Sequence, residues 1–486
     1  MERLIAFLLA ALLLPFSHPK NQDTCVLRAM LIGSDTFVTQ ENTYPVAQNN
    51  LKNMQTLLQS DHRRYQDISI HYETITAPDR LQAEMRHVFA GCDENDISLI
   101  YFSTHGTMTE SETGLYLSDG TAETLLSPQF LAHLLSDIPG TKILILDACN
   151  SGAFIGKGRN DTHLFHPFIG DDIYVITSAS ACEASWQWQS TQHGMSGGSY
   201  FTTLLTDLLS GYHAADGNKD NTVTINEAFS CIRENIASST PQRYPEDAAD
   251  FPLYTYSTGT VTEQPAISGL TFDDTLLSAE ESDVYFSFTV HRETQLYYQL
   301  VYYKEGKWDF DNAAFFHDTQ ESDGPLLPGR KQRKLSLAPQ TNEDSGYVMI
   351  QLFSVEDEVP VLIGGRLLCV QPSGGSVQLQ VETADGFDPC AGEEMCILVS
   401  HDTPCALSVT VRNASGKSIR RLAYAQPTRP LQFPSPATTF YWDGKDNQGR
   451  MAAPGKYYIQ VQTTLGDTRF TAESDPFVLH TVSEEE

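Results

Sequence analysis

The feature that most constrains the fold of this chain is a series of short apolar runs that alternate with helical patterns before residue 258. The runs are expected to form strands, at residues 25–33, 68–72, 97–103, 142–147 and 173–178. Apolar residues at helical spacing fall between them, at 47–58, 78–89, from 127 onward and at 199–209. Apolar strands separated by helices indicate a mostly parallel sheet with helices on both faces. We therefore expect a three-layer α/β sandwich at residues 21–258, with its ligand site beyond the carboxyl ends of the strands.

After residue 258 the pattern changes to short strands separated by Gly, Pro and Asp turns. The segments DVYFSFTV (283–290) and QLYYQLVYY (295–303) are typical of β-strands, and similar segments continue to the end of the chain. This pattern predicts two all-β sandwich domains. We place them at residues 266–385, without an assignable role, and at residues 390–482.

Charge and the first residues indicate the environment of the protein. The chain has 62 Asp and Glu against 31 Lys and Arg, a net charge of −31, which argues against nucleic-acid partners.

Residues 4–14 are all apolar. Eleven apolar residues are too few to span a bilayer, but they suit the core of a signal peptide at residues 1–20. The alternatives are a buried strand and a membrane tether. No later run reaches the ~18 apolar residues of a membrane helix. We expect no integral membrane span and a secreted, periplasmic or cell-surface location.

The nine cysteines form no CxxC pair, so the sequence does not suggest a zinc site. An odd number leaves at least one thiol unpaired in an exported protein. Cys390, Cys396 and Cys405 are close enough in sequence to hold a local bridge, although the sequence does not fix any pairing.

Two of the predicted strands end in reactive side chains. The run at 97–103 continues into His105 and Gly106, and the run at 142–147 continues through Asp147 into Cys149. The separation of 44 positions from His105 to Cys149 suits one crossover between neighbouring parallel strands. A His and a Cys brought together in this way form a base and a nucleophile. The alternatives are a buried core thiol and a simple turn.

These motifs carry a resemblance to a known family. ISLIYFSTHG (97–106) and KILILDACNSG (142–152) resemble the caspase, metacaspase and legumain clan of cysteine peptidases, which includes bacterial caspase-like proteins, and the likeness covers roughly residues 25–255. The resemblance implies that His105 is the catalytic base or acid and Cys149 the nucleophile. The amides of Gly106 and Cys149 would bind the oxyanion. Asn150 departs from the Asp or His that the family has after the cysteine.

The same resemblance bears on specificity. Relatives that cut after Arg or Lys have an acid two residues before the cysteine, where this chain has Asp147, and a carboxylate there would pair with the substrate cation. The alternatives are that Asp147 caps backbone N–H groups, or that the preference is for Asn, as in legumain-like members. Ser178 and Glu183 are candidates for another wall of the substrate pocket. Basic specificity would place self-cleavage after Lys157 or Arg159 in a Gly-rich loop.

A second constellation has the spacing of a calcium-binding loop. Oxygen-bearing residues occupy positions 1, 3, 5, 7 and 12 of that loop: Asp216, Asn218, Asp220, Thr222 through its carbonyl, and Glu227. Position 6 is Asn221, which tolerates the left-handed backbone that Gly usually supplies. The alternative is a polar turn that caps a helix. The expected cofactor is Ca²⁺ at most, with no organic cofactor.

The C-terminal region also has a likeness. WDGKDNQG (442–449) and APGKYYIQV (453–461) resemble the Ig-like domain of flagellar hook-capping proteins over about residues 395–480, which implies a structural or cell-surface anchoring module. Together the motifs predict a secreted bacterial cysteine endopeptidase that acts on a protein or peptide. The alternative is a non-catalytic adhesion or scaffold protein whose caspase-like domain only binds partners.

Overall fold

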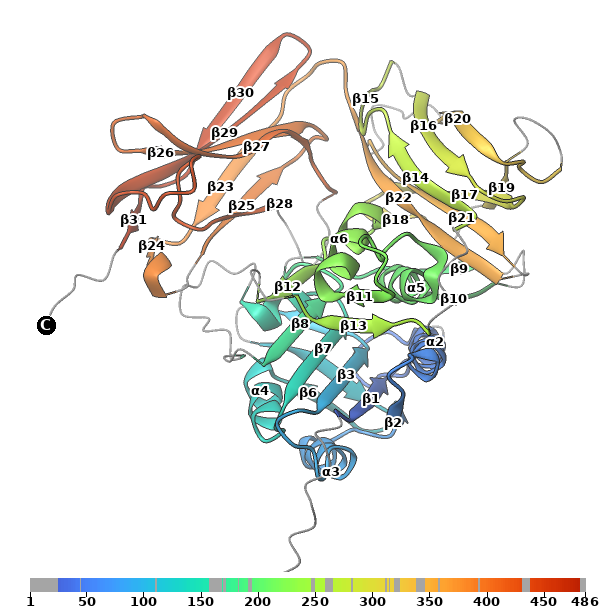
Figure 1. Cartoon of the computed structure of the whole chain (residues 1–486). Coiled ribbons are helices and arrows are strands. Elements are labelled where there is room, and N and C mark those ends of the chain that lie inside the picture. The colour runs from blue at the N-terminus through green and yellow to red at the C-terminus, as the bar shows by residue number, and fades with distance from the viewer. Residues whose placement is uncertain are drawn as a thin grey trace, which may run out of the picture.

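The computed structural model describes residues 25–480 except for several short segments. The segments left out are 44, 110–111, 157–167, 169–171, 182, 191–194, 246–249, 258–264, 281–282, 311–312, 314, 319–323, 338–345, 357–358, 392–393 and 431–437. The predicted signal peptide and the predicted processing residues Lys157 and Arg159 lie outside the described residues. The chain forms one α/β region, drawn blue to green in Figure 1, and two β regions, drawn yellow and orange to red.

A six-stranded sheet forms the centre of the α/β region. Its order is β12-β8-β7-β3-β1-β2, and its strands are β1 (Leu27–Gly33), β2 (Tyr65–Tyr72), β3 (Ile97–Ser103), β7 (Thr141–Asp147), β8 (Ile173–Thr177) and β12 (Gln242–Tyr244). The strands from β8 to β2 pair in parallel, and β12 pairs antiparallel to β8 at one edge. The strands β3 and β7, which are buried along almost their whole length, lie in the middle of this sheet, where both faces are covered.

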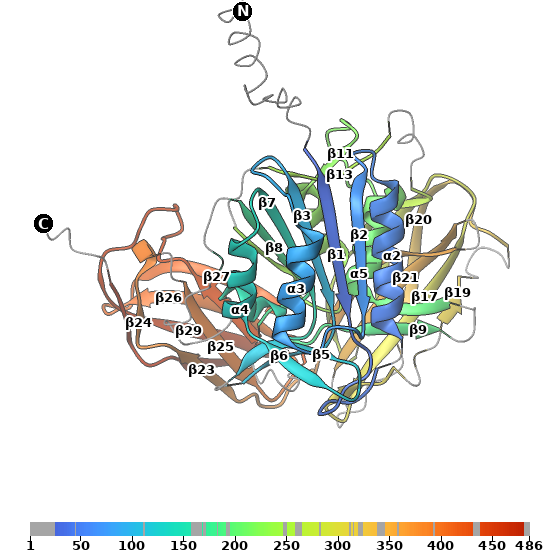
Figure 2. The same cartoon turned by 90° about the horizontal axis from the view of Figure 1, so that it is seen from below.

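Helices cover both faces of the sheet (Figure 2). On one face lie α3 (Pro78–Val88) and α4 (Pro128–Ser136). On the other face lie α2 (Val46–Ser60), α5 (Tyr200–Asp207) and α6 (Ile225–Asn235). Side chains alternate between the faces, as the two-residue period of a strand requires. Ile100 and Leu144 pack in the cluster with α3 and α4, whereas Leu99 and Ile143 pack in the cluster with α2, α5 and α6.

Short sheets and helix caps complete this region. The small sheets are β4 (Gly106–Met108), β5 (Thr113–Ser118) and β6 (Glu123–Leu126); β9 (Gln187–Ser190) with β10 (Met195–Ser199); and β11 (Thr222–Thr224) with β13 (Pro252–Thr255). The Ser127 hydroxyl accepts the N–H of Phe130 and caps α4, whose first residue is Pro128. Ser199 caps α5 in the same way. The hydroxyl followed by Pro was therefore a reliable signal for the start of α4.

The middle region is a pair of β-sheets. One sheet is β14-β16-β20 and the other is β15-β22-β21-β17-β18, with β19 beside β17. The strands are β14 (Ile267–Phe272), β15 (Leu276–Ser278), β16 (Asp283–Val290), β17 (Gln295–Lys304), β18 (Lys307–Trp308), β19 (Phe315–His317), β20 (Gly329–Ser336), β21 (Tyr347–Glu356) and β22 (Val359–Gln371). Its own core lies between the sheets and contains Phe286, Phe288 and Ile350.

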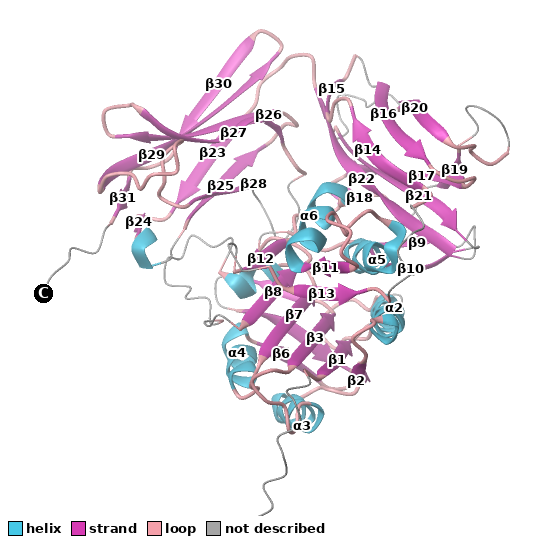
Figure 3. Cartoon of the chain, in the orientation of Figure 1, coloured by secondary structure: helices cyan, strands magenta, loops and turns pink. Residues whose placement is uncertain are grey.

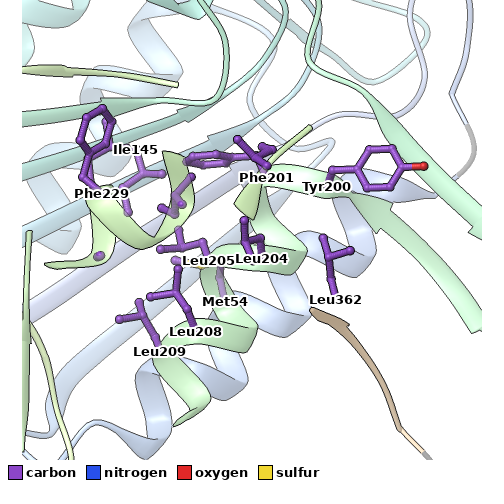
Figure 4. Close-up of a cluster of buried hydrophobic side chains, with 14 of the residues drawn as sticks. Met54, Ile145, Tyr200, Phe201, Leu204, Leu205, Leu208, Leu209, Phe229 and Leu362 are labelled. Atoms are coloured by element: carbon purple, nitrogen blue, oxygen red, sulfur yellow. The ribbon is translucent and has the colours of Figure 1, made fainter. Parts of the chain in front are cut away.

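The middle region also packs directly onto the α/β region. Phe353 and Leu362 belong to the same buried cluster as Leu204 and Leu205 of α5. Figure 4 shows Leu362 together with the two leucines of α5. The Tyr200 hydroxyl donates to Oε1 of Gln299 at 2.7 Å. The helix layer formed by α5 is therefore buried from both sides, by the central sheet and by the middle region.

The C-terminal region is a second pair of β-sheets, and Figure 3 shows that the long helices lie elsewhere, around the first sheet. Its sheets are β23-β25-β28 and β24-β31-β29-β26-β27, with β30 beside β29. The strands are β23 (Leu379–Thr383), β24 (Gly386–Phe387), β25 (Met395–His401), β26 (Ala406–Asn413), β27 (Ser418–Pro427), β28 (Thr438–Trp442), β29 (Gly455–Leu465), β30 (Thr468–Glu473) and β31 (Phe477–Leu479). Trp442 is fully buried against Phe387, Tyr457 and Phe477.

No cysteine in the described part of the chain forms a disulfide, so these residues do not contain the local bridge suggested for Cys390, Cys396 and Cys405. Cys396 and Cys405 are buried in the C-terminal region, whereas Cys390 is exposed. Within the same described residues, no helix combines the length and the apolar character needed to cross a bilayer.

Asp207 at the end of α5 gives the first prediction. Its Oδ2 accepts the Leu362 N–H at 2.8 Å, and burial, together with the negative Glu356, raises the pKa of this carboxyl well above its usual value. A raised folded-state pKa adds stability below the unfolded-state pKa, and that stability is lost as pH rises through the folded-state value. Asp207→Asn keeps an acceptor and removes the titration. Its melting temperature should exceed that of the wild type by a few degrees near pH 8, with the difference vanishing toward pH 4.

Melting curves across this pH range measure the effect. Asp67→Asn, at an exposed position on β2, is the matched control and should leave the melting temperature unchanged. A constant difference between Asp207→Asn and the wild type at every pH would contradict the assignment.

Candidate active site

The two predicted strand ends lie side by side. β3 and β7 pair in parallel with Ser103 opposite Asp147, and the Thr104 N–H donates to the Asp147 carbonyl at 3.2 Å. His105 and Cys149 each follow these paired residues by two positions. Both therefore leave the same carboxyl edge of neighbouring strands, where ligand sites of open α/β sheets form.

The segments that carry His105 and Cys149 touch at Gly106. A Cβ placed on Gly106 would lie 2.0 Å from the carbonyl oxygen of Cys149 and 3.2 Å from the Cβ of Ala148. A separation of 2.0 Å is far inside van der Waals contact, so only glycine fits at this position. The Gly106 backbone therefore packs directly against the segment that carries Cys149.

The imidazole of His105 is oriented by a backbone carbonyl. Its Nε2 lies 3.0 Å from the Glu41 oxygen, and because a carbonyl only accepts, Nε2 carries the hydrogen. In the neutral ring Nδ1 then holds a free lone pair. The Phe37 ring packs at 4.4 Å between centroids. Burial lowers the pKa of His105, so the ring is neutral near pH 7 and ready to accept a proton.

The loop that supplies Glu41 and Phe37 is fixed by carboxylates. Asp35, which is buried, accepts the N–H groups of Ala47 and Gln48 at 2.9 and 3.1 Å, at the start of α2. Glu73 accepts the N–H of Asp35 and both the N–H and the hydroxyl of Thr36. These bonds hold the segment after β1 in one conformation, which places the Glu41 carbonyl against His105.

Cys149 is a half-buried free thiol. Its Sγ lies 3.8 Å from the Ser185 carbonyl, as a donor in a weak hydrogen bond. Burial, together with the negative Asp147, raises the pKa of the thiol above its usual value. Both groups therefore favour their neutral forms, and the thiol would have to lose its proton before it could act as a nucleophile.

The turn after Cys149 is held by the loop that follows β8. Asn150 has φ +56°, in the left-handed region that Asn tolerates. Its N–H donates to the Glu183 carbonyl at 2.8 Å, and its Nδ2 donates to the Ala181 carbonyl at 2.7 Å. Asn150, which departs from the family pattern, thus connects the turn after Cys149 to the loop after β8.

Asp147 lies beneath the strand ends in a cluster of hydroxyl groups. It is 4% exposed and accepts from the hydroxyls of Ser185 at 2.9 Å, Thr202 at 2.6 Å and Ser199. Burial raises the pKa of this carboxyl. Its partners are hydroxyls of the segment between β8 and α5 and of the first turn of α5, and not the backbone N–H groups that the capping alternative predicts.

Ser178 and Glu183, the two other predicted pocket residues, have different surroundings. Ser178 is fully buried, and its hydroxyl accepts the N–H of Ala148 and donates to the Ala148 carbonyl. It therefore supports the strand end behind Cys149 instead of forming a pocket wall, because a polar group buried at this depth must satisfy its hydrogen bonds within the protein. Glu183 accepts from Arg429 of the C-terminal region at 3.0 Å.

Glu183 also lines a cavity of about 120 Å³ at the junction of the three regions. The loop after β8 contributes Ser180, Glu183 and Trp186, and the β regions contribute Trp308 and Arg429. His105, Cys149 and Asp147 are not among its lining residues. The cavity is thus next to the loop that holds the thiol, on the side of the β regions.

The predicted calcium loop closes on itself. Asp216 accepts the N–H groups of Asp220 and Asn221, and Glu227 accepts the Gly217 N–H and forms a capping box with Thr224 at the start of α6. Asn218 and Asp220 accept neighbouring N–H groups, one of them from Thr222. Across the described residues, no group of three His, Cys, Asp or Glu is arranged to hold a metal ion. The structure therefore has the helix-capping turn, and calcium binding stays a prediction.

The sequence did not predict three contacts of this site, which are made by the Glu41 carbonyl, the Ser185 carbonyl and the Arg429 side chain. The carbonyls of Glu41 and Ser185 act through the backbone, so their side chains give no signal. Arg429 is 246 residues from Glu183, and no local pattern connects the two.

Comparison with known proteins agrees with this geometry. The model of the caspase domain family, Peptidase_C14, matches residues 27–272, just over half of the chain. The chain belongs to the caspase domain family. This family of cysteine peptidases is the one that the strand-end motifs resembled, and the match extends to the end of β14. The model of the FlgD Ig-like domain matches residues 402–467 of this caspase-domain protein.

Two solved structures are similar to parts of the caspase-domain protein. One is a protein of Geobacter sulfurreducens, at 12% identity and a TM-score of 0.34, which covers 48% of this chain and 100% of its own. The other is caspase-1 of Spodoptera frugiperda, at 13% identity and a TM-score of 0.32, which covers 45% of this chain and 86% of its own. No curated protein sequence matches the chain.

Gly106 gives the second prediction. Gly106→Ala places a methyl group 2.0 Å from the Cys149 oxygen, so the strand-end backbone must shift, which should cost about 1–3 kcal/mol of unfolding free energy. Gly374→Ala is the matched control, because a Cβ at that exposed position meets nothing within 4 Å. Its change should stay within about 0.5 kcal/mol. Denaturant unfolding measures both, and equal stabilities would refute the contact between Gly106 and Cys149.

Proposed function

We propose that the protein is a cysteine endopeptidase in which Cys149 is the nucleophile and His105 the general base. The observation that carries this proposal is the contact of Gly106 with the Cys149 backbone, at a sheet edge where the Glu41 carbonyl leaves His105 Nδ1 free. Membership of a cysteine peptidase family supports a protein or peptide as substrate.

The mechanism follows from the neutral resting pair. His105 Nδ1 takes the proton from Cys149 Sγ, and the thiolate attacks the carbonyl carbon of the scissile peptide bond. The amides of Gly106 and Cys149 stabilise the oxyanion. The C–N bond then breaks as His105 returns the proton to the leaving amine. Water, deprotonated by His105, finally hydrolyses the thioester and regenerates the thiol.

The proposed specificity is for Arg or Lys at the residue before the cleaved bond. Asp147 is the supporting residue, because its carboxylate lies two residues before the nucleophile at the sheet edge. A substrate guanidinium or ammonium would favour the ionised carboxylate and offset the cost of its burial. The hydroxyls of Ser185 and Ser199 can then remain as its other donors.

The environment of the enzyme belongs to the same proposal. The apolar run at residues 4–14 supports export to the periplasm, the cell surface or the medium of a bacterium. The net charge of −31 supports a role without nucleic-acid partners. The match to an Ig-like domain supports a surface-anchoring role for the C-terminal region. The spacing at residues 216–227 supports weak calcium binding.

A panel of Arg, Lys, Asn and Asp peptide reporters under reducing conditions gives the third prediction. The wild type should hydrolyse the Arg and Lys reporters, and Cys149→Ala should lose roughly a thousandfold or more in rate. Asp147→Asn should lower kcat/KM for the Arg and Lys reporters roughly a hundredfold, because one charge partner is lost, with a smaller effect on Asn. A calcium chelator in parallel reactions measures the contribution of calcium.

The scaffold alternative predicts a different result. It predicts no turnover of any reporter and no irreversible labelling of Cys149 by a peptide electrophile. Turnover with a preference for Asn or Asp would keep the enzyme and overturn the basic specificity.

Self-cleavage gives the fourth prediction. The purified wild type should be nicked after Lys157 or Arg159, whereas Cys149→Ala should stay intact, since its nucleophile is missing. Mass spectrometry of the fragments locates the cut. In a wild-type background, the double substitution Lys157→Gln and Arg159→Gln should abolish the cut. Nicking to the same extent in the wild type and in Cys149→Ala would show that another peptidase makes the cut.

A further inference from the structure

An arginine of the C-terminal region reaches the loop that holds the candidate nucleophile. Arg429 follows β27, and its Nη1 donates to Oε1 of Glu183 at 3.0 Å. Its Nη2 lies 3.5 Å from the Ser239 carbonyl, in the segment before β12. The guanidinium therefore connects the C-terminal region to two adjacent segments of the caspase domain. The side chains of Arg429 and Glu183 are 34% and 16% exposed, so water screens this ion pair only in part.

Glu183 also contacts the turn after Cys149, so it connects that turn to Arg429. Its side chain also accepts from the N–H and the hydroxyl of Thr240, at 2.6 and 3.3 Å. Its backbone carbonyl accepts the N–H of Asn150 at 2.8 Å. Two residues further on, the Ser185 carbonyl receives the Cys149 thiol and the Ser185 hydroxyl donates to Asp147. One short loop thus connects Arg429 to the thiol and to the proposed specificity residue.

The segment that carries Arg429 is itself firmly held. The neighbouring Thr428 is 1% exposed, and its hydroxyl lies 2.6 Å from the Tyr347 hydroxyl of the middle region. The Thr428 hydroxyl also accepts the Cys405 N–H, and the Thr428 N–H donates to the Cys405 carbonyl. The guanidinium therefore projects from a point where all three regions meet, beside the cavity that Glu183 and Arg429 line.

We propose that Arg429 is a positioning residue for the active site, through which the C-terminal β region holds the loop after β8 against Cys149. The C-terminal region is then a part of the catalytic machinery, and its removal or displacement loosens the thiol. The part of this inference that concerns turnover rests on the proposed peptidase function, whereas the part that concerns the thiol does not.

The experiment compares variants of the full-length protein. Arg429→Ala removes the guanidinium, and Arg429→Lys keeps the charge without the two-pronged geometry. Arg421→Ala is the matched control, because Arg421 is an exposed arginine of the neighbouring strand β27 and lies over Tyr424 instead of reaching the caspase domain. Melting curves establish that each variant is folded.

The first readout is the pH profile of Cys149 alkylation by iodoacetamide, followed by mass spectrometry of the labelled peptide. The thiolate displaces iodide and forms a carbon–sulfur bond, so the rate reports ionisation and access without any peptidase activity. A looser loop leaves the thiol less buried, so Arg429→Ala should react roughly tenfold faster near pH 7, with its profile shifted to lower pH. Arg429→Lys should lie between Arg429→Ala and the wild type.

The second readout is the split between kcat and KM on the best reporter. Arg429→Ala should lower kcat roughly tenfold with a smaller change in KM, because a displaced nucleophile slows the chemical step. Alkylation and kcat equal to those of Arg421→Ala would overturn the inference. A shifted alkylation profile in a protein without turnover would uphold the positioning contact and overturn the peptidase function.

A second route covers the case in which Arg429→Ala does not fold. Glu183→Gln removes the charge that Arg429 pairs with and keeps an oxygen for the Thr240 N–H. This variant should reproduce the faster alkylation expected of Arg429→Ala. A profile identical to that of the wild type would overturn the inference.

Discussion

The parallel pairing of β3 with β7 is the constraint on which the rest of the structure depends. Ser103 lies opposite Asp147, so the two strands end at the same level, and the residues two positions further on leave the sheet together. A shift of register by one residue would turn every side chain of a strand to the other face. The apolar residues on both faces of these strands prevent that shift, since both helix layers bury them. The packing of the sheet therefore fixes where His105 and Cys149 emerge.

Burial also determines the resting chemistry of this edge. It raises the pKa of the Cys149 thiol and lowers that of the His105 imidazole, so both groups favour their neutral forms. The backbone carbonyls of Glu41 and Ser185 orient the two groups without adding charge. A charged side chain in place of either carbonyl would shift the pKa of His105 or Cys149 strongly, whereas a neutral carbonyl mainly fixes the orientation of the group.

The two β regions contribute more to the caspase domain than their sequence patterns indicate. Two strands of the middle region cover α5 with Phe353 and Leu362, so the helix is buried between two layers. The C-terminal region reaches the loop after β8 through Arg429. Alternating apolar and polar residues predicted β-sandwiches in both places, but this pattern describes only which face of a strand is buried. Contacts between domains depend on a few side chains at the surface, which have no periodicity.

The sequence by itself determined the five parallel strands of the central sheet, the start of α4 and the polar residues at two strand ends, because apolar periodicity, a capping hydroxyl and a following proline act locally. The antiparallel edge strand β12 was not predicted. Tertiary structure alone decided the partners of these residues. Ser178 became a support for the strand end and Glu183 an ion-pair partner, since each is surrounded by segments distant in the chain. The capping turn at 216–227 is different, because its residues bond to their own local backbone, as the sequence alternative to a calcium loop predicted. Spacing fixes which groups are near each other along the chain, whereas hydrogen-bond partners depend on which segments folding brings together.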